Sequence, residues 1–289
     1  MKKLVGRTGD YLSLVKFSHT VFAMPFALVG YFLGATRPDH GFSLRTFLLM
    51  LACMVFARSA AMAFNRWADV RFDILNPRTS GREIPSGRIS QGHALIFVIV
   101  SSLLFIATTA LLNTMTLLLS PVALLIVLGY SYTKRFTWLC HLVLGLGLSL
   151  APIGAYIAVT GTFALLPVLY SILVLTWVSG FDIIYSLQDD QFDRETGLYS
   201  IPAVMSRGKA LTVSVALHAV TLLLAVAAGI IGHGGVIYWA GALIFAAMLI
   251  YQHLIVTPDD LSRVNLAFGT MNGMAGIIYG LAVVADLLL

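Results

Sequence analysis

Apolar residues run along this chain in blocks of about twenty, separated by shorter polar stretches. A helix needs about 20 apolar residues to cross a bilayer, and nine blocks meet that length. They lie at 15–35, 43–65, 93–112, 115–131, 139–159, 163–185, 209–231, 234–256 and 264–287. Because apolar and polar residues do not alternate, the pattern predicts helices rather than a transmembrane β-barrel.

Composition leads to the same class of protein. The mean hydropathy is +0.91 and only 11% of the residues are charged, whereas soluble domains carry about a quarter. We therefore expect an all-α integral membrane protein with nine transmembrane helices. The first block has full spanning length and no clear cleavage site follows it, so we expect a retained helix rather than a signal peptide. No organelle-targeting extension precedes it, which favours a prokaryotic membrane.

Basic residues predict the orientation, because cytoplasmic loops collect Lys and Arg. Nine spans place nearly all of the 18 basic residues on the side of the N-terminus, against only Arg37 and Arg45 on the other side. We expect a cytoplasmic N-terminus and an external C-terminus, in a cytoplasmic (inner) membrane. This bias also accounts for the net charge of +5, so no nucleic-acid partner is implied. Nothing in the sequence indicates an obligate protein partner.

Two long polar loops, at 66–92 and 186–208, share a pattern. Asp69 and Asp73 recur as Asp189 and Asp193 at an offset of 120 residues, and Ile-Pro and Gly-x-Ala-Leu motifs follow both pairs. We expect a single domain over 1–289. It would contain two pseudo-repeats, at about 15–135 and 139–256, and a final helix at 264–287.

Helical spacing places the acidic residues on faces. Arg58, Asn65, Asp69 and Asp73 fall on one stripe of the second helix, and Asp182, Tyr185 or Ser186, Asp189 and Asp193 fall on one stripe of the sixth. An isolated pair could be a solvated helix end. Four carboxylates that converge on one pocket repel strongly and need a cation, and Mg²⁺ binds carboxylate, phosphate and water oxygens. Two pairs thus predict two Mg²⁺ ions that hold one polyanion.

Basic residues inside or near the predicted helices add to this site. Lys134 and Arg135 lie in a short loop and are candidate phosphate contacts. Arg58 lies about two turns inside the second helix, where a charge normally marks a ligand pathway. We expect it beside Asn65 and Asp182, with its guanidinium available for a substrate carboxylate.

The motifs resemble those of the UbiA superfamily of intramembrane aromatic prenyltransferases. The two aspartate-rich signatures are joined by three further stretches in the same order. These are Arg58-Ser59-Ala60, Arg78-Thr79-x-x-Arg82-x-Ile84-Pro85-Ser86-Gly87 and Tyr130-x3-Lys134-Arg135. Glu83 departs from the family pattern, in which many members have Pro after the Arg, and this loosens the link to the 4-hydroxybenzoate branch.

The resemblance implies nine helices around a central cavity, with the two long loops over its cytoplasmic end and a lateral opening to lipid. It implies metal binding by Asn65, Asp69, Asp73, Asp189 and Asp193, and diphosphate binding by Arg82, Lys134, Arg135 and Tyr130. A polyprenyl diphosphate would ionise to an allylic cation, shielded by Tyr130 or Tyr185. The cation would alkylate a phenol deprotonated or oriented by Asp182 and held through its carboxylate by Arg58. No histidine is needed, and we expect His19 and His141 to be hydrogen-bonded core residues.

Several alternatives stay open. The leading acceptor is 4-hydroxybenzoate or a similar carboxylated phenol in quinone biosynthesis, and a naphthoate-like acceptor of the menaquinone pathway is the runner-up. Makers of haem O, chlorophyll and archaeal ether lipids belong to the same superfamily. A cation-coupled transporter is the rival from another class, although acidic clusters at one membrane face fit it less well.

Overall fold

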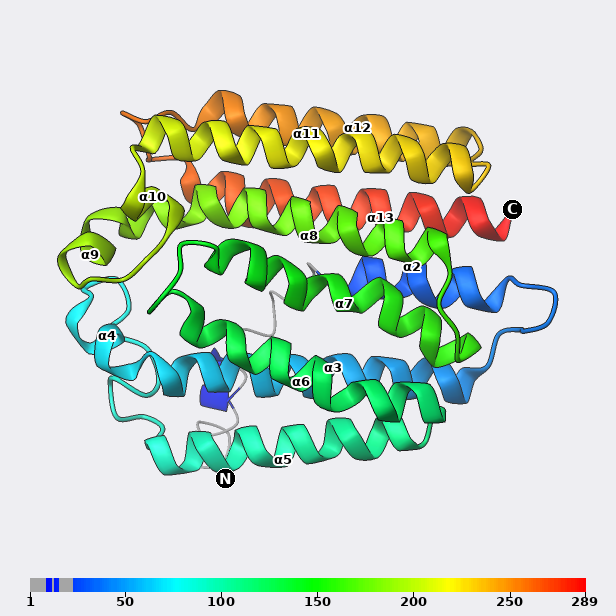
Figure 1. The fold of residues 1–289 in the computed structure, drawn as a ribbon, viewed down its shortest axis with the longest axis horizontal. Helices are drawn as coiled ribbons and strands as arrows, with labels where there is room; N and C mark the ends of the chain where they lie inside the picture. Colours follow the sequence, from blue (N-terminus) through cyan, green and yellow to red (C-terminus); the bar gives the residue numbers. More distant parts are fainter. Residues whose placement is uncertain (1–8, 12, 16–22) are drawn as a thin grey trace.

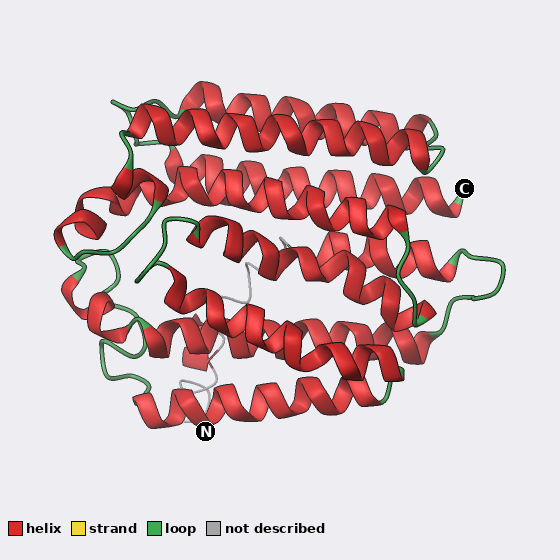
Figure 2. Ribbon diagram, in the orientation of Figure 1, coloured by secondary structure: helices red, strands yellow, loops and turns green. Residues whose placement is uncertain are grey.

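The computed structural model describes residues 9–11, 13–15 and 23–289, and the ordered elements in these ranges are helices (Figure 2). The long ones are α2 (Met24–Ala35), α3 (Leu44–Ala68), α5 (Gln91–Ala110), α6 (Thr114–Thr133), α7 (Cys140–Thr160), α8 (Leu165–Ser186), α11 (Arg207–Ile231), α12 (Val236–Ile255) and α13 (Asn272–Leu288). The short ones are α4 (Val70–Leu75), the 3-10 helix η2 (Leu187–Asp189), α9 (Asp190–Glu195), α10 (Ile201–Val204) and the π-helix η3 (Leu266–Met271).

The predicted membrane class is confirmed. Within the described residues eight helices are long and apolar enough to cross a bilayer, and α2 is a shorter apolar helix. Positions 16–22 of the first predicted span, including His19, lie outside the described residues. Large apolar side chains such as Leu118, Leu125, Leu243 and Leu254 are exposed on the outside of the bundle. In water they would be unfavourable, but they suit lipid.

Polar side chains define where the helices begin. The side chains of Ser43, Ser90, Asn113 and Ser206 each accept a hydrogen bond from a main-chain N–H in the first turn of the next helix. They replace partners that a helix start otherwise lacks. The predicted span boundaries differ from the observed helix ends by only a few residues, except in the first span and at the start of the last, where the π-helix η3 precedes α13.

Helix α8 occupies the centre of the bundle and packs against α7 on one side and α11 on the other. Trp177 of α8 is fully buried and contacts the rings of Phe26 and Phe245. A Cβ on Gly145 of α7 would collide with the carbonyl oxygen of Leu175, so glycine there permits the two helices to approach closely. This contact places the start of α7 next to the end of α8.

Both long loops lie at the same end of the bundle. Figure 1 shows α4, α9 and α10 together at one end, and the C-terminus at the opposite end. The connections at the C-terminal end are short, as between α7 and α8, where Gly161 adopts φ +67°. The fold thus brings the two acidic stretches predicted from sequence to one end of the molecule.

Candidate active site

The first acidic stripe keeps helical spacing across a break in the helix. Helix α3 ends at Ala68, yet the N–H of Asp69 bonds the Asn65 carbonyl and the N–H of Asp73 bonds the Asp69 carbonyl, both at 2.9 Å. Asn65 also donates from Nδ2 to Asp69 Oδ2 at 3.0 Å. Asn65, Asp69 and Asp73 therefore face the same cavity, as the spacing predicted.

The second stripe follows α8 through η2 into α9. Asp182, Tyr185, Asp189 and Asp193 all line the same cavity as the first stripe. Asp190, between the last two, faces another direction: Arg207 binds both of its carboxylate oxygens at 2.9 Å. The predicted convergence of the two stripes is thus observed, and one neighbouring carboxylate is set apart from it.

Each of the four converging carboxylates contacts a basic side chain. Arg82 Nη1 lies 2.7 Å from Asp73 Oδ1, Arg135 Nη2 lies 3.5 Å from Asp69 Oδ1, and Lys134 Nζ lies 3.7 Å from Asp193 Oδ1. Arg78 binds both oxygens of Asp189, with Nε to Oδ1 at 2.9 Å. The repulsion between the carboxylates is therefore already offset by protein cations. This corrects the expectation that repulsion alone would require a metal.

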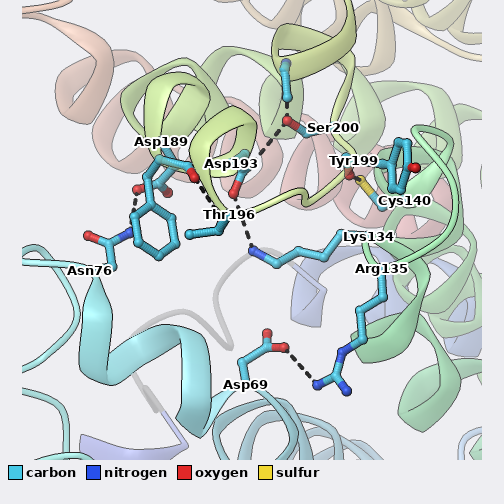
Figure 3. Close-up of polar contacts among 12 residues, drawn as sticks. Asp69, Asn76, Lys134, Arg135, Cys140, Asp189, Asp193, Thr196, Tyr199 and Ser200 are labelled. Atoms are coloured by element: carbon cyan, nitrogen blue, oxygen red, sulfur yellow. Dashed lines mark hydrogen bonds and ion pairs between the residues drawn. The ribbon is translucent and has the colours of Figure 1, made fainter.

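Several of these contacts join the two halves of the chain (Figure 3). Asp189 accepts from Asn76 Nδ2 at 3.1 Å as well as from Arg78, and both donors follow α4. Lys134, at the end of α6, reaches Asp193 of α9, which also accepts from Ser200 Oγ at 3.0 Å. Neither half alone could form the site.

The cavity has a volume of about 600 Å³ and changes character along its length. At the loop end it is lined by the carboxylates and by Arg78, Arg82 and Lys134. Away from that end apolar side chains line it, among them Met54, Ile126, Val127, Leu148 and Ile157. Such a space can hold a charged head group at one end and an apolar chain along the helices.

Arg58 lines the cavity between these two regions, but its surroundings differ from the prediction. Among the described residues no hydrogen bond or ion pair joins Arg58 to Asn65 or Asp182, and its Nε is buried without a partner. Asn65 is seven residues away, about 10 Å along the helix, and bonds Asp69 instead. The guanidinium thus lines the cavity, and no described residue supplies it with an acceptor.

Two tyrosines flank the loop end of the cavity. The Tyr185 ring stacks on Phe268 with centroids 4.0 Å apart, and Tyr185 Oη accepts from Arg78 Nη1 at 2.9 Å. Tyr130 also lines the cavity. Arg135 binds the Ala68 carbonyl at 2.6 Å and is not among the lining residues, so it supports Asp69 from behind.

The donor set suits a hard divalent cation. Asp73 Oδ2 and Asp193 Oδ1 are buried and accept no hydrogen bond. Asp73 Oδ2 is free for another ligand, whereas Asp193 Oδ1 faces Lys134 Nζ at 3.7 Å. Burial raises the pKa of the Asp69 carboxyl, while Lys134 and Arg135 oppose this effect. In the described ranges no three His, Cys, Asp or Glu side chains surround one point, so phosphate and water oxygens would have to complete the coordination of any ion.

Sequence reasoning missed some residues of the site. Arg78 was noted only as part of a motif, and Asn76, Ser200 and Phe268 were not noted. His141, expected as a core residue, is buried but also lines the cavity, and its Nδ1 lies 2.7 Å from Asp182 Oδ2. Glu83, the departure from the motif, does not line the cavity. It accepts a hydrogen bond from Ser13 and lies near Arg88.

Comparison with known proteins agrees with these observations. The profile of the UbiA prenyltransferase family matches residues 23–275. A 4-hydroxybenzoate octaprenyltransferase of Aeromonas salmonicida is 31% identical over 184 residues, which cover 64% of this chain and 63% of that protein. One from Francisella tularensis subsp. mediasiatica is 31% identical over 193 residues, which cover 66% of this chain and 68% of that protein.

Solved structures share the fold. The apo structure of a UbiA homolog from Aeropyrum pernix has a TM-score of 0.84 at 38% identity and covers 94% of this chain and 98% of its own. A UbiA homolog from Archaeoglobus fulgidus, solved with GPP and Mg²⁺, has a TM-score of 0.73 at 22% identity and covers 96% and 99%. The resemblance inferred from the motifs is confirmed, and the chain belongs to the UbiA prenyltransferase family.

Proposed function

We propose that this protein transfers a polyprenyl group from polyprenyl diphosphate to a ring carbon of a carboxylated phenol, such as 4-hydroxybenzoate, in quinone biosynthesis. The observation that carries the proposal is the cavity itself, with carboxylates and cations at one end, an apolar length beyond them and a free guanidinium between. The named activity of the Aeromonas and Francisella relatives supports it.

Mg²⁺ would be held by Asp69, Asp73, Asp189 and Asp193, with Asn65 orienting Asp69, and we infer two ions. When bound, the metal would neutralise charge on the leaving diphosphate. Arg78, Arg82 and Lys134 line the cavity beside these carboxylates and would bind phosphate oxygens. Arg78 was not among the predicted ligands, and we add it because it is a cavity-lining cation. Arg135 would act by holding Asp69.

The acceptor would lie deeper, between Arg58 and Asp182. A buried guanidinium without a partner is unfavourable, and a substrate carboxylate would supply the missing hydrogen-bond acceptors. The faces of Tyr130 and Tyr185 would shield the allylic cation from water. A naphthoate-like acceptor remains the runner-up, because it too carries a carboxylate.

The prenyl donor and product are both lipids, so we infer that they exchange with the bilayer. We also infer a cytoplasmic site in a bacterial inner membrane, because the two long loops lie at the site end and most Lys and Arg residues fall on that side of the predicted spans. The duplication of the two halves stays a prediction. In both halves a long helix is followed by a short one that carries the last Asp of the motif, Asp73 in α4 after α3 and Asp193 in α9 after α8.

The test is a reconstitution. The purified protein in nanodiscs with Mg²⁺, geranyl diphosphate and 4-hydroxybenzoate should form a C-prenylated acid identified by mass and NMR. The same assay with 1,4-dihydroxy-2-naphthoate tests the runner-up. Chelation of Mg²⁺ should abolish product. Cation flux through proteoliposomes without any prenylated product would refute the proposal in favour of a transporter.

A further inference from the structure

His141 forms a buried contact with Asp182 in the wall of the cavity. The two residues come from adjacent helices, α7 and α8, and both line the cavity. The His141 side chain is 3% exposed and that of Asp182 is 21% exposed, so the carboxylate is the member of the pair that a ligand can reach. Their closest atoms, Nδ1 and Oδ2, are 2.7 Å apart.

The surroundings of the imidazole define its tautomer. Nε2 accepts a hydrogen bond from the main-chain N–H of Ile201 at 3.3 Å, so Nε2 must be unprotonated. The ring proton is then on Nδ1, which donates to Asp182 Oδ2. Both ring nitrogens are occupied, and His141 itself cannot act on a substrate.

Asp182 keeps one oxygen for a ligand. Within the described part of the chain no donor contacts Oδ1, whereas Oδ2 is held by His141. A carboxylate with one oxygen fixed by a buried donor presents the other in a defined direction. This is the arrangement needed by a group that takes a proton from a substrate hydroxyl.

The position of the His141 backbone does not depend on the imidazole. Ser179 Oγ donates to the His141 carbonyl at 3.1 Å, and Gly145, one turn along α7, permits the close approach to α8. Replacement of the imidazole should therefore leave the start of α7 in place. The two hydrogen bonds of the imidazole, to Asp182 and to Ile201, can therefore be removed one at a time by substitution.

We propose that His141 is a positioning residue that holds Asp182 so that its Oδ1 accepts the phenolic proton of the aromatic acceptor. This inference rests on the proposed prenyl transfer. The C1–O bond of the donor breaks, its electron pair leaves with the diphosphate, and a ring carbon ortho to the phenolic oxygen forms the new C–C bond. Asp182 takes the phenolic proton, which gives a neutral cyclohexadienone. The ring-carbon proton then passes to the released diphosphate, and Asp182 returns its proton to the oxygen.

Two amides of different length separate the roles of the imidazole. In His141→Asn the amide nitrogen replaces Nδ1 and can donate to Asp182, but nothing accepts from Ile201. In His141→Gln the amide oxygen replaces Nε2 and can accept from Ile201, but the donor to Asp182 is lost. We expect His141→Gln to lower kcat by about 10–100-fold with an unchanged KM for geranyl diphosphate, and His141→Asn to recover most of kcat.

A second measurement varies the acceptor rather than the protein. In 3-fluoro-4-hydroxybenzoate the phenol is more acidic and one ortho carbon stays free, so the reaction depends less on the proton acceptor. The ratio of His141→Gln to wild-type kcat should rise about three- to tenfold with this acceptor. A loss of folding would lower kcat for both acceptors equally, and melting curves provide a separate check on it.

The outcomes are distinct. Full activity of His141→Gln with an impaired His141→Asn would show that the imidazole only anchors Ile201, and would overturn the inference. A ratio of His141→Gln to wild-type kcat that is the same for both acceptors would also overturn it, even if His141→Gln and His141→Asn are both impaired. Failure of the proposed function would look different, because the wild-type protein itself would then form no prenylated phenol.

Discussion

At the scale of single residues, the site pairs carboxylates with cations but leaves some carboxylate oxygens without a hydrogen bond. Asp73 contacts Arg82 through Oδ1 and has its Oδ2 buried without a hydrogen bond. Asp193 Oδ1 is also buried without a hydrogen bond, and its nearest cation, Lys134 Nζ, is 3.7 Å away. A buried acceptor left unsatisfied is unfavourable by about 1–3 kcal/mol. Binding of a metal ion there would remove this penalty, so the free oxygens indicate where a ligand belongs.

Neighbouring carboxylates allow a matched test of this idea. Asp193→Asn should lower kcat/KM by about 10²–10³-fold, because it removes a charged metal ligand. Asp190→Asn should retain activity and lower the melting temperature instead, since Asp190 faces Arg207 and Arg194. Steady-state assays and thermal melts of the two variants check this. Equal loss of activity in both would contradict the assignment.

Arg58 makes a prediction about the acceptor. Arg58→Leu should raise KM for 4-hydroxybenzoate by about 10–150-fold, because a charge-assisted hydrogen bond contributes about 1.5–3 kcal/mol. A phenol without a carboxylate should show little change. Arg45→Leu is the control, since Arg45 lies on the exposed start of α3 and donates to the Leu111 carbonyl. An unchanged KM in Arg58→Leu would remove Arg58 from the acceptor site.

The pKa of Asp69 makes a prediction about pH. Burial raises the pKa of this carboxyl in the folded protein. The metal-free protein therefore loses stability as the pH rises from the ordinary pKa of an aspartate to the raised pKa of Asp69. Mg²⁺ binds the ionised form and should reverse the loss. We expect Mg²⁺ to raise the melting temperature more at pH 7.5 than at pH 5, with Asp69→Asn reducing the difference. A Mg²⁺ effect equal at both pH values would argue against Asp69 as a ligand.

At the scale of elements, helical periodicity was enough to predict the two acidic stripes. Hydrogen bonds between residues four apart place Asn65, Asp69 and Asp73 on one face independently of the tertiary structure, so this part of the site could be predicted from spacing. Contacts between helices could not be predicted in this way. The Arg78–Asp189 pair and the His141–Asp182 pair depend on which helices pack together, and a periodic pattern carries no information about that.

The α7–α8 contact also makes a prediction. Gly145→Ala should destabilise the protein by about 1–3 kcal/mol, because the new methyl group would overlap the Leu175 carbonyl and Ser179 Oγ. Gly129→Ala is the matched control, since a Cβ there meets nothing within 4 Å. Chemical denaturation in detergent should show a loss for Gly145→Ala alone. Two stable variants would mean that the helices tolerate a wider separation.

At the scale of the whole molecule, the four converging carboxylates and the cations that contact them lie at one end of a lipid-compatible bundle. The two longest loops lie at that end, and the loop 66–92 is rich in Arg, whereas the connections at the opposite end are shorter. The whole-chain hydropathy pattern predicted this architecture, because bilayer thickness fixes helix length. It could not predict how the bundle encloses a cavity.

Orientation in the membrane is the prediction at this scale. We expect the C-terminus to lie outside, so a C-terminal alkaline phosphatase fusion should be active and a C-terminal GFP fusion should be dark. Fusions truncated in the 186–208 loop should give the reverse result. Bright GFP at the C-terminus would invert the proposed topology and place the site outside.

The ion pairs between the two halves of the chain restrict how this protein can evolve. A change at Asp189 would remove the carboxylate that pairs with the Arg78 guanidinium, and a change at Asp193 would remove the carboxylate that faces Lys134. Substitutions at 78 and 189, or at 134 and 193, should therefore occur together among distant relatives. If the halves arose from one ancestral gene, the site residues of each half now depend on those of the other, so a substitution in one half requires a compensating substitution in the other.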